Sequence, residues 1–185
     1  MKIVFFGSSD YALPTLKALV AADMPPALVV TKPDAPRGRG RKIYPAEVRL
    51  GAEELDLTCE QPEDVNSPEY VKRLAELAPD VGLVVSYGVI MSNGLLDVPK
   101  SGCLNTHASL LPLYRGAAPI QHAIRDGARE TGVTVIRLVE ELDAGDILLQ
   151  EKVPIGDRAT AGEMRAQLAA LSGEVAVRAL KLIQE

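Results

Sequence analysis

The sequence contains no tryptophan, two cysteines and two histidines among 185 residues. Cys59 and Cys103 lack the paired spacing of zinc ligands and are too few for the disulfide framework of a small secreted domain. We therefore expect a reducing, cytoplasmic environment and no metal site. The apolar run after Met1 is too short for a secretion signal or a membrane span, so we expect no membrane partner either.

An excess of positive charge is also missing. The net charge of −5 argues against a general nucleic-acid binder, and we expect no DNA partner. Contact with phosphate would have to come from a local basic patch. Nearly half of the residues are hydrophobic, which is enough for one sizeable core, so we predict one domain over residues 1–185.

Four short apolar runs are typical of buried parallel strands: residues 2–6, 27–31, 81–86 and 102–107. Segments with helical spacing, 11–22 and 67–80 among them, lie between these runs. This alternation predicts an α/β fold with a Rossmann-like, mostly parallel sheet and helices on both of its faces.

The second half of the chain adds a different pattern. We expect a short helix over 118–127, two antiparallel strands over 131–139 and 146–155, and a long helix that starts with a capping box and covers 160–185. The two strands would extend the sheet at one edge. The turn after the first strand holds Gly7 but lacks the G-x-G-x-x-G spacing, which argues against dinucleotide binding.

The stretch CLNTHASLLPLYRGAAPI at 103–120 holds the first candidate site. Asn105 and His107 are two residues apart on a predicted strand, so their side chains share a face at the carboxyl edge of the sheet, where α/β proteins bind ligands. The alternative is a histidine that merely has its hydrogen bonds satisfied at a strand end. Asp143 and Asp146 flank a tight turn, and on geometry either could orient the histidine or simply cap the turn.

No covalent nucleophile stands out. Ser109 lacks the strand-to-helix elbow of hydrolases, and Cys103 lies deep in an apolar run. An Asn, His and Asp set suits direct attack on a carbonyl, because the amide donates to the developing oxyanion while the histidine handles the proton.

Several motifs carry a family resemblance. NTHASLLPLYRGAAPI followed by LDAGDI resembles the signature of the formyltransferases that use 10-formyltetrahydrofolate. KPDAPRGRGRK is similar to a loop of the methionyl-tRNA formyltransferase branch. IVFFGSSDYALPTLKAL and VVSYGVI fit at corresponding places, so the resemblance covers essentially the whole chain.

The resemblance implies the formyltransferase fold and formyl transfer from 10-formyltetrahydrofolate to the amine of initiator methionyl-tRNA, with no covalent enzyme intermediate. It assigns Asn105, His107 and Asp143 as the catalytic trio and implies a cis peptide bond before Pro112. The folate site that it implies consists of Ser86, Tyr87, Gly88, Ile90, Met91, Ser109, Leu110, Leu111 and Pro112.

The segment 31–47 contains several prolines and glycines, which disfavour regular structure, and it is rich in basic residues. From charge alone it could be an ordinary solvated loop. The resemblance makes it a tRNA-binding arm, with Arg39 as the leading contact. The candidate tRNA contacts are Arg37, Arg39, Arg41 and Lys42.

Two departures and two rivals bear on this interpretation. Family members usually continue YGxIL into Leu-Pro, whereas this chain has Met91 and Ser92. Full-length tRNA formyltransferases also carry a C-terminal domain, which we expect to be absent from a chain that stops at Glu185. The rivals are a small-molecule formyltransferase, acting on glycinamide ribonucleotide or an amino sugar, and an inactive folate- or RNA-binding module.

Overall fold

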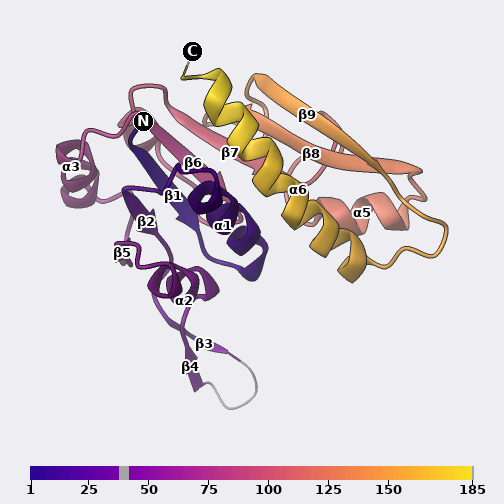
Figure 1. The fold of residues 1–185 in the computed structure, drawn as a ribbon, viewed down its shortest axis with the longest axis horizontal. Helices are drawn as coiled ribbons and strands as arrows, with labels where there is room; N and C mark the ends of the chain where they lie inside the picture. The colour runs from indigo at the N-terminus through magenta and orange to yellow at the C-terminus, as the bar shows by residue number, and fades with distance from the viewer. Residues whose placement is uncertain (38–41, 185) are drawn as a thin grey trace.

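The computed structural model describes residues 1–37 and 42–184, and its centre is a seven-stranded sheet in the order β5-β2-β1-β6-β7-β8-β9 (Figure 1). Neighbouring strands are parallel from β5 to β7, while β8 is antiparallel to both of its neighbours, β7 and β9. The predicted Rossmann-like sheet with antiparallel edge strands is confirmed. The strands are β1 (Ile3–Gly7), β2 (Leu28–Val30), β5 (Cys59–Glu60), β6 (Val81–Val85), β7 (Cys103–His107), β8 (Glu130–Arg137) and β9 (Ile147–Pro154).

Helices cover both faces of this sheet and create two hydrophobic clusters. Phe5 and Phe6 are consecutive in β1 and both fully buried, yet they belong to opposite clusters, because side chains alternate along a strand. α1 and α6 pack on the Phe5 side, and α3 and α4 on the Phe6 side. The helices are α1 (Leu13–Ala21), preceded by the 3-10 turn η1 (Asp10–Ala12), then α2 (Glu47–Glu54), α3 (Pro68–Glu76), α4 (Asn93–Leu96), α5 (Pro119–Arg125) and α6 (Ala161–Leu182).

The basic segment 31–47 is more regular than predicted. It contains an antiparallel pair, β3 (Ala35–Arg37) and β4 (Lys42–Tyr44), so the expectation of irregular structure is wrong there. Pro36 fits because a two-stranded ribbon consists only of edge strands, where the missing N–H of proline is tolerated. Figure 1 shows this hairpin standing out from the molecule at the end opposite the two termini.

Three short elements, α2, α4 and β5, were not predicted from the sequence. None of the described helices is both long and apolar enough to cross a membrane. The long helix α6 begins with the expected capping box, in which Thr160 accepts from the Glu163 amide and the Glu163 carboxylate accepts from the Thr160 amide.

α6 packs closely on α1 at Gly173. A Cβ added there would lie 2.9 Å from the Ala18 Cβ and 3.1 Å from the Pro14 carbonyl oxygen. A side chain at this position would therefore force the two helices apart.

We predict that Gly173→Val lowers the free energy of unfolding by about 1–3 kcal/mol, since the valine overpacks the contact between α1 and α6. Gly162→Val is the matched control, because Gly162 is exposed in the first turn of the same helix and its Cβ would meet only the Thr160 hydroxyl, at 4.0 Å. The control should change stability by no more than about 0.5 kcal/mol. Urea unfolding of both variants checks this, and equal losses would contradict it.

Candidate active site

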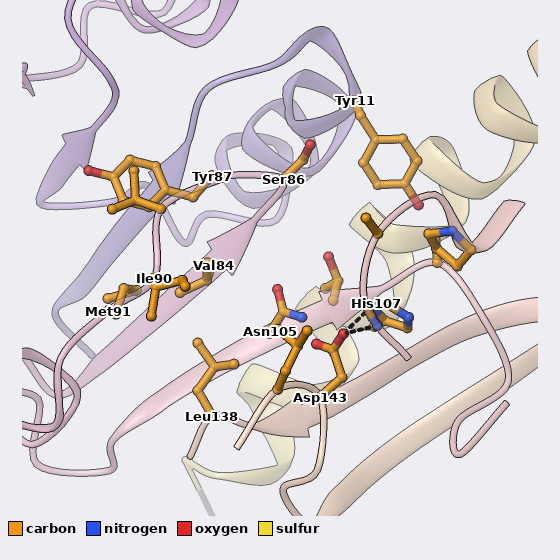
Figure 2. Close-up of a pocket in the computed structure, with 18 of the residues that line it drawn as sticks. Tyr11, Val84, Ser86, Tyr87, Ile90, Met91, Asn105, His107, Leu138 and Asp143 are labelled. Atoms are coloured by element: carbon orange, nitrogen blue, oxygen red, sulfur yellow. Dashed lines mark hydrogen bonds and ion pairs between the residues drawn. The ribbon is translucent and has the colours of Figure 1, made fainter. Parts of the chain in front are cut away.

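The candidate site begins where β7 ends. Asn105 is half-buried and His107 is 7% exposed, and both side chains lie on the same face at the carboxyl edge of the sheet. No described residue hydrogen-bonds the Asn105 side chain, so its amide is available to the cavity that it lines. Figure 2 shows Asn105, His107 and Asp143 grouped together in the wall of that cavity.

Asp143 reaches His107 from the turn between β8 and β9. One of its carboxylate oxygens, Oδ2, lies 3.4 Å from His107 Nδ1 and accepts a hydrogen bond of 2.8 Å from the Gly116 amide. Asp146 is exposed instead, and its carbonyl accepts from the Arg137 amide. The structure therefore places Asp143, and not Asp146, against the histidine.

The turn that carries Asp143 depends on Gly145. A Cβ on Gly145 would clash with the backbone carbonyl of Arg137, so no larger residue fits without moving the turn. Asp143 itself has a φ of 47°, in the left-handed region that side chains rarely adopt. Close approach of Gly145 to β8 and the left-handed backbone of Asp143 together direct the carboxylate inward.

The second ring nitrogen of His107 also faces an acceptor. Nε2 lies 2.8 Å from the Tyr114 carbonyl oxygen, and Tyr114 has a φ of 57°. A carbonyl can only accept, so Nε2 donates to it, while Nδ1 faces a carboxylate. The Nε2 contact is a hydrogen bond, and the Nδ1 contact is an ion pair when the ring is protonated, so the two contacts together fix the plane of the ring.

These side chains line a cavity of about 600 Å³. One side of it is apolar and is formed by residues in and after β6 and by the turn after β8. Ile90 is 86% exposed and Leu142 65% exposed at its mouth, and Tyr87 packs edge-on against Phe6 deeper in. The apolar residues on this side are Val84, Tyr87, Val89, Ile90, Met91, Leu96, Leu138, Val139 and Leu142.

All five residues predicted in the 86–91 segment line the cavity: Ser86, Tyr87, Gly88, Ile90 and Met91. Ser86 and Gly88 both have a positive φ, which turns the chain across the end of the sheet. Met91 is buried in the wall, and Ser92 caps α4 by accepting from the Leu95 amide. Met91 therefore completes this wall, and Ser92 starts the helix behind it.

The segment Ser109–Pro112 is not part of the described cavity wall. Ser109 is fully buried and donates to the Leu113 carbonyl, and the Thr134 hydroxyl donates to the Ser109 carbonyl and accepts from the Leu111 amide. The expected cis peptide bond before Pro112 is confirmed. The polar groups of the segment Ser109–Pro112 hold the turn that brings the Tyr114 carbonyl to His107. This segment therefore supports the site from behind the cavity wall.

The opposite side of the cavity was missed by sequence reasoning. Figure 2 shows Tyr11 of η1 across Asn105 and His107 from Ile90 and Met91, and Arg165 of α6, which also lines the cavity, lies over the Tyr11 ring. Burial raises the pKa of Tyr11 to about 12, and that of Tyr87 to about 12, so both phenols are neutral at physiological pH. Tyr11 follows the first strand closely enough for its place at the sheet edge to be inferred, but no pattern in the sequence marks Arg165.

Neither candidate nucleophile is available. Burial raises the pKa of Cys103 to about 12, and the Ser109 hydroxyl is already donated to a carbonyl. Cys59 and Cys103 are both free thiols. Among the described residues, no group of three or more His, Cys, Asp and Glu side chains is placed to hold a metal ion.

Of the four predicted tRNA contacts, the structure describes two, and both lie in the hairpin. Arg37 ends β3 and Lys42 begins β4, while Arg39 and Arg41 lie outside the described residues. None of the described hairpin residues lines the cavity. The hairpin is joined to the site through α2, which contacts η1.

The chain is similar to known proteins over nearly its whole length. A family model described as formyl transferase matches residues 1–180. The chain belongs to the formyl transferase family. Two curated relatives are methionyl-tRNA formyltransferases, one from Moorella thermoacetica, 48% identical over 99% of this chain, and one from Methylococcus capsulatus, 48% identical over 97%.

This member of the family spans 59% and 58% of the lengths of those two relatives. Among solved structures, phosphoribosylglycinamide formyltransferase from Bacillus halodurans superposes with a TM-score of 0.81, covering 100% of this chain and 96% of that one, at 24% identity. At that identity the likeness shows a shared fold and nothing about the acceptor.

Gly145→Ala should lower the free energy of unfolding by about 1–3 kcal/mol, because the added methyl collides with backbone in the turn that holds Asp143. Gly156→Ala is the control, since a Cβ there would meet no atom within 4 Å. NMR of the imidazole ring should show His107 displaced only in Gly145→Ala. An unshifted ring together with unchanged stability would show that the turn does not need glycine.

Proposed function

We propose that this chain is the domain that transfers the formyl group of 10-formyltetrahydrofolate to the amine of initiator methionyl-tRNA. The observation that carries the proposal is the grouping of Asn105, His107 and Asp143 beside an apolar cavity. The names of the 48% identical relatives support tRNA as the acceptor. The free thiols fit a reducing compartment such as the cytoplasm.

The apolar side of the cavity suits the donor. A volume of about 600 Å³ is in the range of small-molecule sites, and a flat heteroaromatic ring is well matched to walls of Val84, Met91 and Leu138. Ile90 and Leu142 leave apolar surface exposed at the mouth, which a ligand extending outward would cover. The residues present therefore fit a folate, with its formyl group directed to Asn105.

The reaction follows from the groups at the end of β7. The acceptor amine attacks the formyl carbon, a new C–N bond forms, and the bond from that carbon to folate N10 breaks. Negative charge develops on the formyl oxygen, where the free Asn105 amide donates a hydrogen bond and the imidazolium of His107 supplies positive charge. The amine loses one proton and N10 gains one, so no covalent enzyme intermediate is required.

Asp143 acts through His107, as a positioning residue. Its carboxylate faces Nδ1 and stabilises the positive ring, while the Tyr114 carbonyl holds Nε2. Direct proton exchange between Nε2 and a substrate requires the ring to release that carbonyl. Otherwise the proton reaches the substrate through water.

The basic hairpin favours tRNA over a small acceptor. At a net charge of −5, contact with phosphate has to be local, and the segment 31–47, which follows the carboxyl end of β2, concentrates basic residues in the sequence. A nucleotide small enough to enter the cavity would not need an arm that projects away from it. The fully assembled trio argues against an inactive binding module, because binding alone does not require it.

The test is a formyl-transfer assay with 10-formyltetrahydrofolate in which charged initiator tRNA and glycinamide ribonucleotide are offered in parallel. We expect transfer to the tRNA. Transfer only to the nucleotide would overturn the acceptor assignment, and transfer to neither would overturn the proposed activity of this chain.

His107→Ala should lower turnover by about 10²–10⁴-fold and leave the donor Kd within about twofold of wild type, since the ring acts on charge and protons and not on the apolar wall. Asn105→Ala should lose about 10²–10³-fold of kcat, the effect of one oxyanion donor. Single-turnover kinetics and calorimetry with tetrahydrofolate separate the two effects. Undiminished turnover in His107→Ala would refute its role.

Arg39→Ala should weaken binding of tRNA and reduce the dependence of log Kd on log salt by about one, because one phosphate contact is lost. Arg158→Ala is the control, an exposed arginine outside the hairpin. Filter binding over a salt series measures both. An equal dependence of log Kd on log salt in Arg39→Ala and wild type would contradict a tRNA contact by Arg39.

A further inference from the structure

A cluster of polar contacts joins α6 to η1 at the cavity, and the proposed reaction does not use it. The Arg165 guanidinium donates to both carboxylate oxygens of Asp10, through Nη1 at 2.8 Å and through Nη2. The same guanidinium lies over the ring of Tyr11, 5.6 Å from its centre. Hydrogen bonding to Arg165 also lowers the pKa of Asp10, so the pair is ionised at neutral pH.

Tyr11 is held at its other end by the same helix. Its hydroxyl shares a 2.9 Å hydrogen bond with the Ser172 hydroxyl, which is fully buried on α6. Tyr11 itself is 7% exposed. α6 therefore fixes the face of the ring, its hydroxyl and, through Asp10, the backbone turn that carries it.

The Tyr11 ring lies on the side of the cavity from which the acceptor would approach. Figure 2 shows Tyr11 on one side of Asn105 and His107, with Ile90 and Met91 on the other side. The apolar Ile90 side suits the donor, so the acceptor has to reach the formyl carbon from the Tyr11 side. The hairpin leads to this side as well, because α2 follows β4 and contacts η1.

We propose that Arg165 is a positioning residue for the acceptor: bonded to Asp10 and stacked on Tyr11, it fixes the wall against which the attacking amine is oriented. This inference rests on the proposed function. Arg165 acts through Tyr11 and need not touch the reacting atoms.

The exposure of the pair agrees with a positioning role. The side chains of Arg165 and Asp10 are 38% and 60% exposed, so their attraction adds little to global stability. A bidentate guanidinium–carboxylate contact nevertheless fixes orientation well. Loss of Arg165 should then loosen η1 locally while the fold stays intact.

The experiment compares Arg165→Met with Arg178→Met in the full chain. Arg178 lies on the same helix and pairs with Glu151 of β9 at 2.8 Å, and neither of these two residues lines the cavity. Both variants lose one ion pair from α6 and gain the same side chain. Asp10→Asn is a third arm, which removes the charge pair but keeps Arg165 over the ring.

Two readouts are taken. The first is amide hydrogen exchange in η1, where the Ala12 amide donates to the Ser9 carbonyl and the Leu13 amide to the Asp10 carbonyl. Exchange should become about tenfold faster in Arg165→Met and unchanged in Arg178→Met, because only the former frees the turn. The second readout is kinetic: KM for the acceptor should rise about tenfold in Arg165→Met, and KM for the donor should stay within about twofold.

The outcomes separate failure of the positioning inference from failure of the proposed function. Unchanged exchange in η1 overturns the positioning inference whether or not the chain transfers formyl groups. Faster exchange with equal rises in both KM values, or with no change in the acceptor KM, overturns the assignment of this wall to the acceptor. Absence of transfer by wild type refutes the proposed function, and the inference about the acceptor falls with it.

Discussion

The contact between Asp143 and His107 is the interaction on which the site depends. It joins the end of a parallel strand, β7, to a turn between two antiparallel strands, and it exists only because β8 pairs with β7 with His107 opposite Thr134. Thr134 also holds the segment Ser109–Leu111, which leads to the carbonyl that fixes the other nitrogen of the ring. One register in the sheet thus sets both partners of the histidine.

The cavity divides around this contact into two sides of different character. The side formed by the 86–91 segment and the turn after β8 is apolar and open at its mouth, as expected of a surface that a flat ligand covers. The side formed by Tyr11 and Arg165 is braced by hydrogen bonds and an ion pair. The proposed reaction brings two substrates together at one carbonyl and needs two such walls, and Asn105 lies between them.

Local patterns predicted much of this arrangement. The continuous apolar runs of β1 and β6 predicted buried parallel strands, and the two-residue spacing of Asn105 and His107 put both side chains at the carboxyl edge. The residue pattern alone left Asp143 and Asp146 open, and only the family resemblance chose Asp143, because no local pattern reports the close approach of Gly145 to Arg137 that directs this turn. Arg165 contacts Asp10 at a separation of 155 residues, which no local pattern predicts. Pro36 argued against a strand in β3, although proline is tolerated in an edge strand.

Family membership and the arrangement of the trio support the proposal of direct transfer at the end of β7. The most direct test is a rapid-quench single turnover in which the donor is labelled at its formyl carbon and initiator methionyl-tRNA is the acceptor. The account predicts that the label passes to the amine of the methionyl-tRNA with none attached to the protein at any time point. Label bound covalently to the protein before it reaches the acceptor, or label that never leaves the donor, would contradict it.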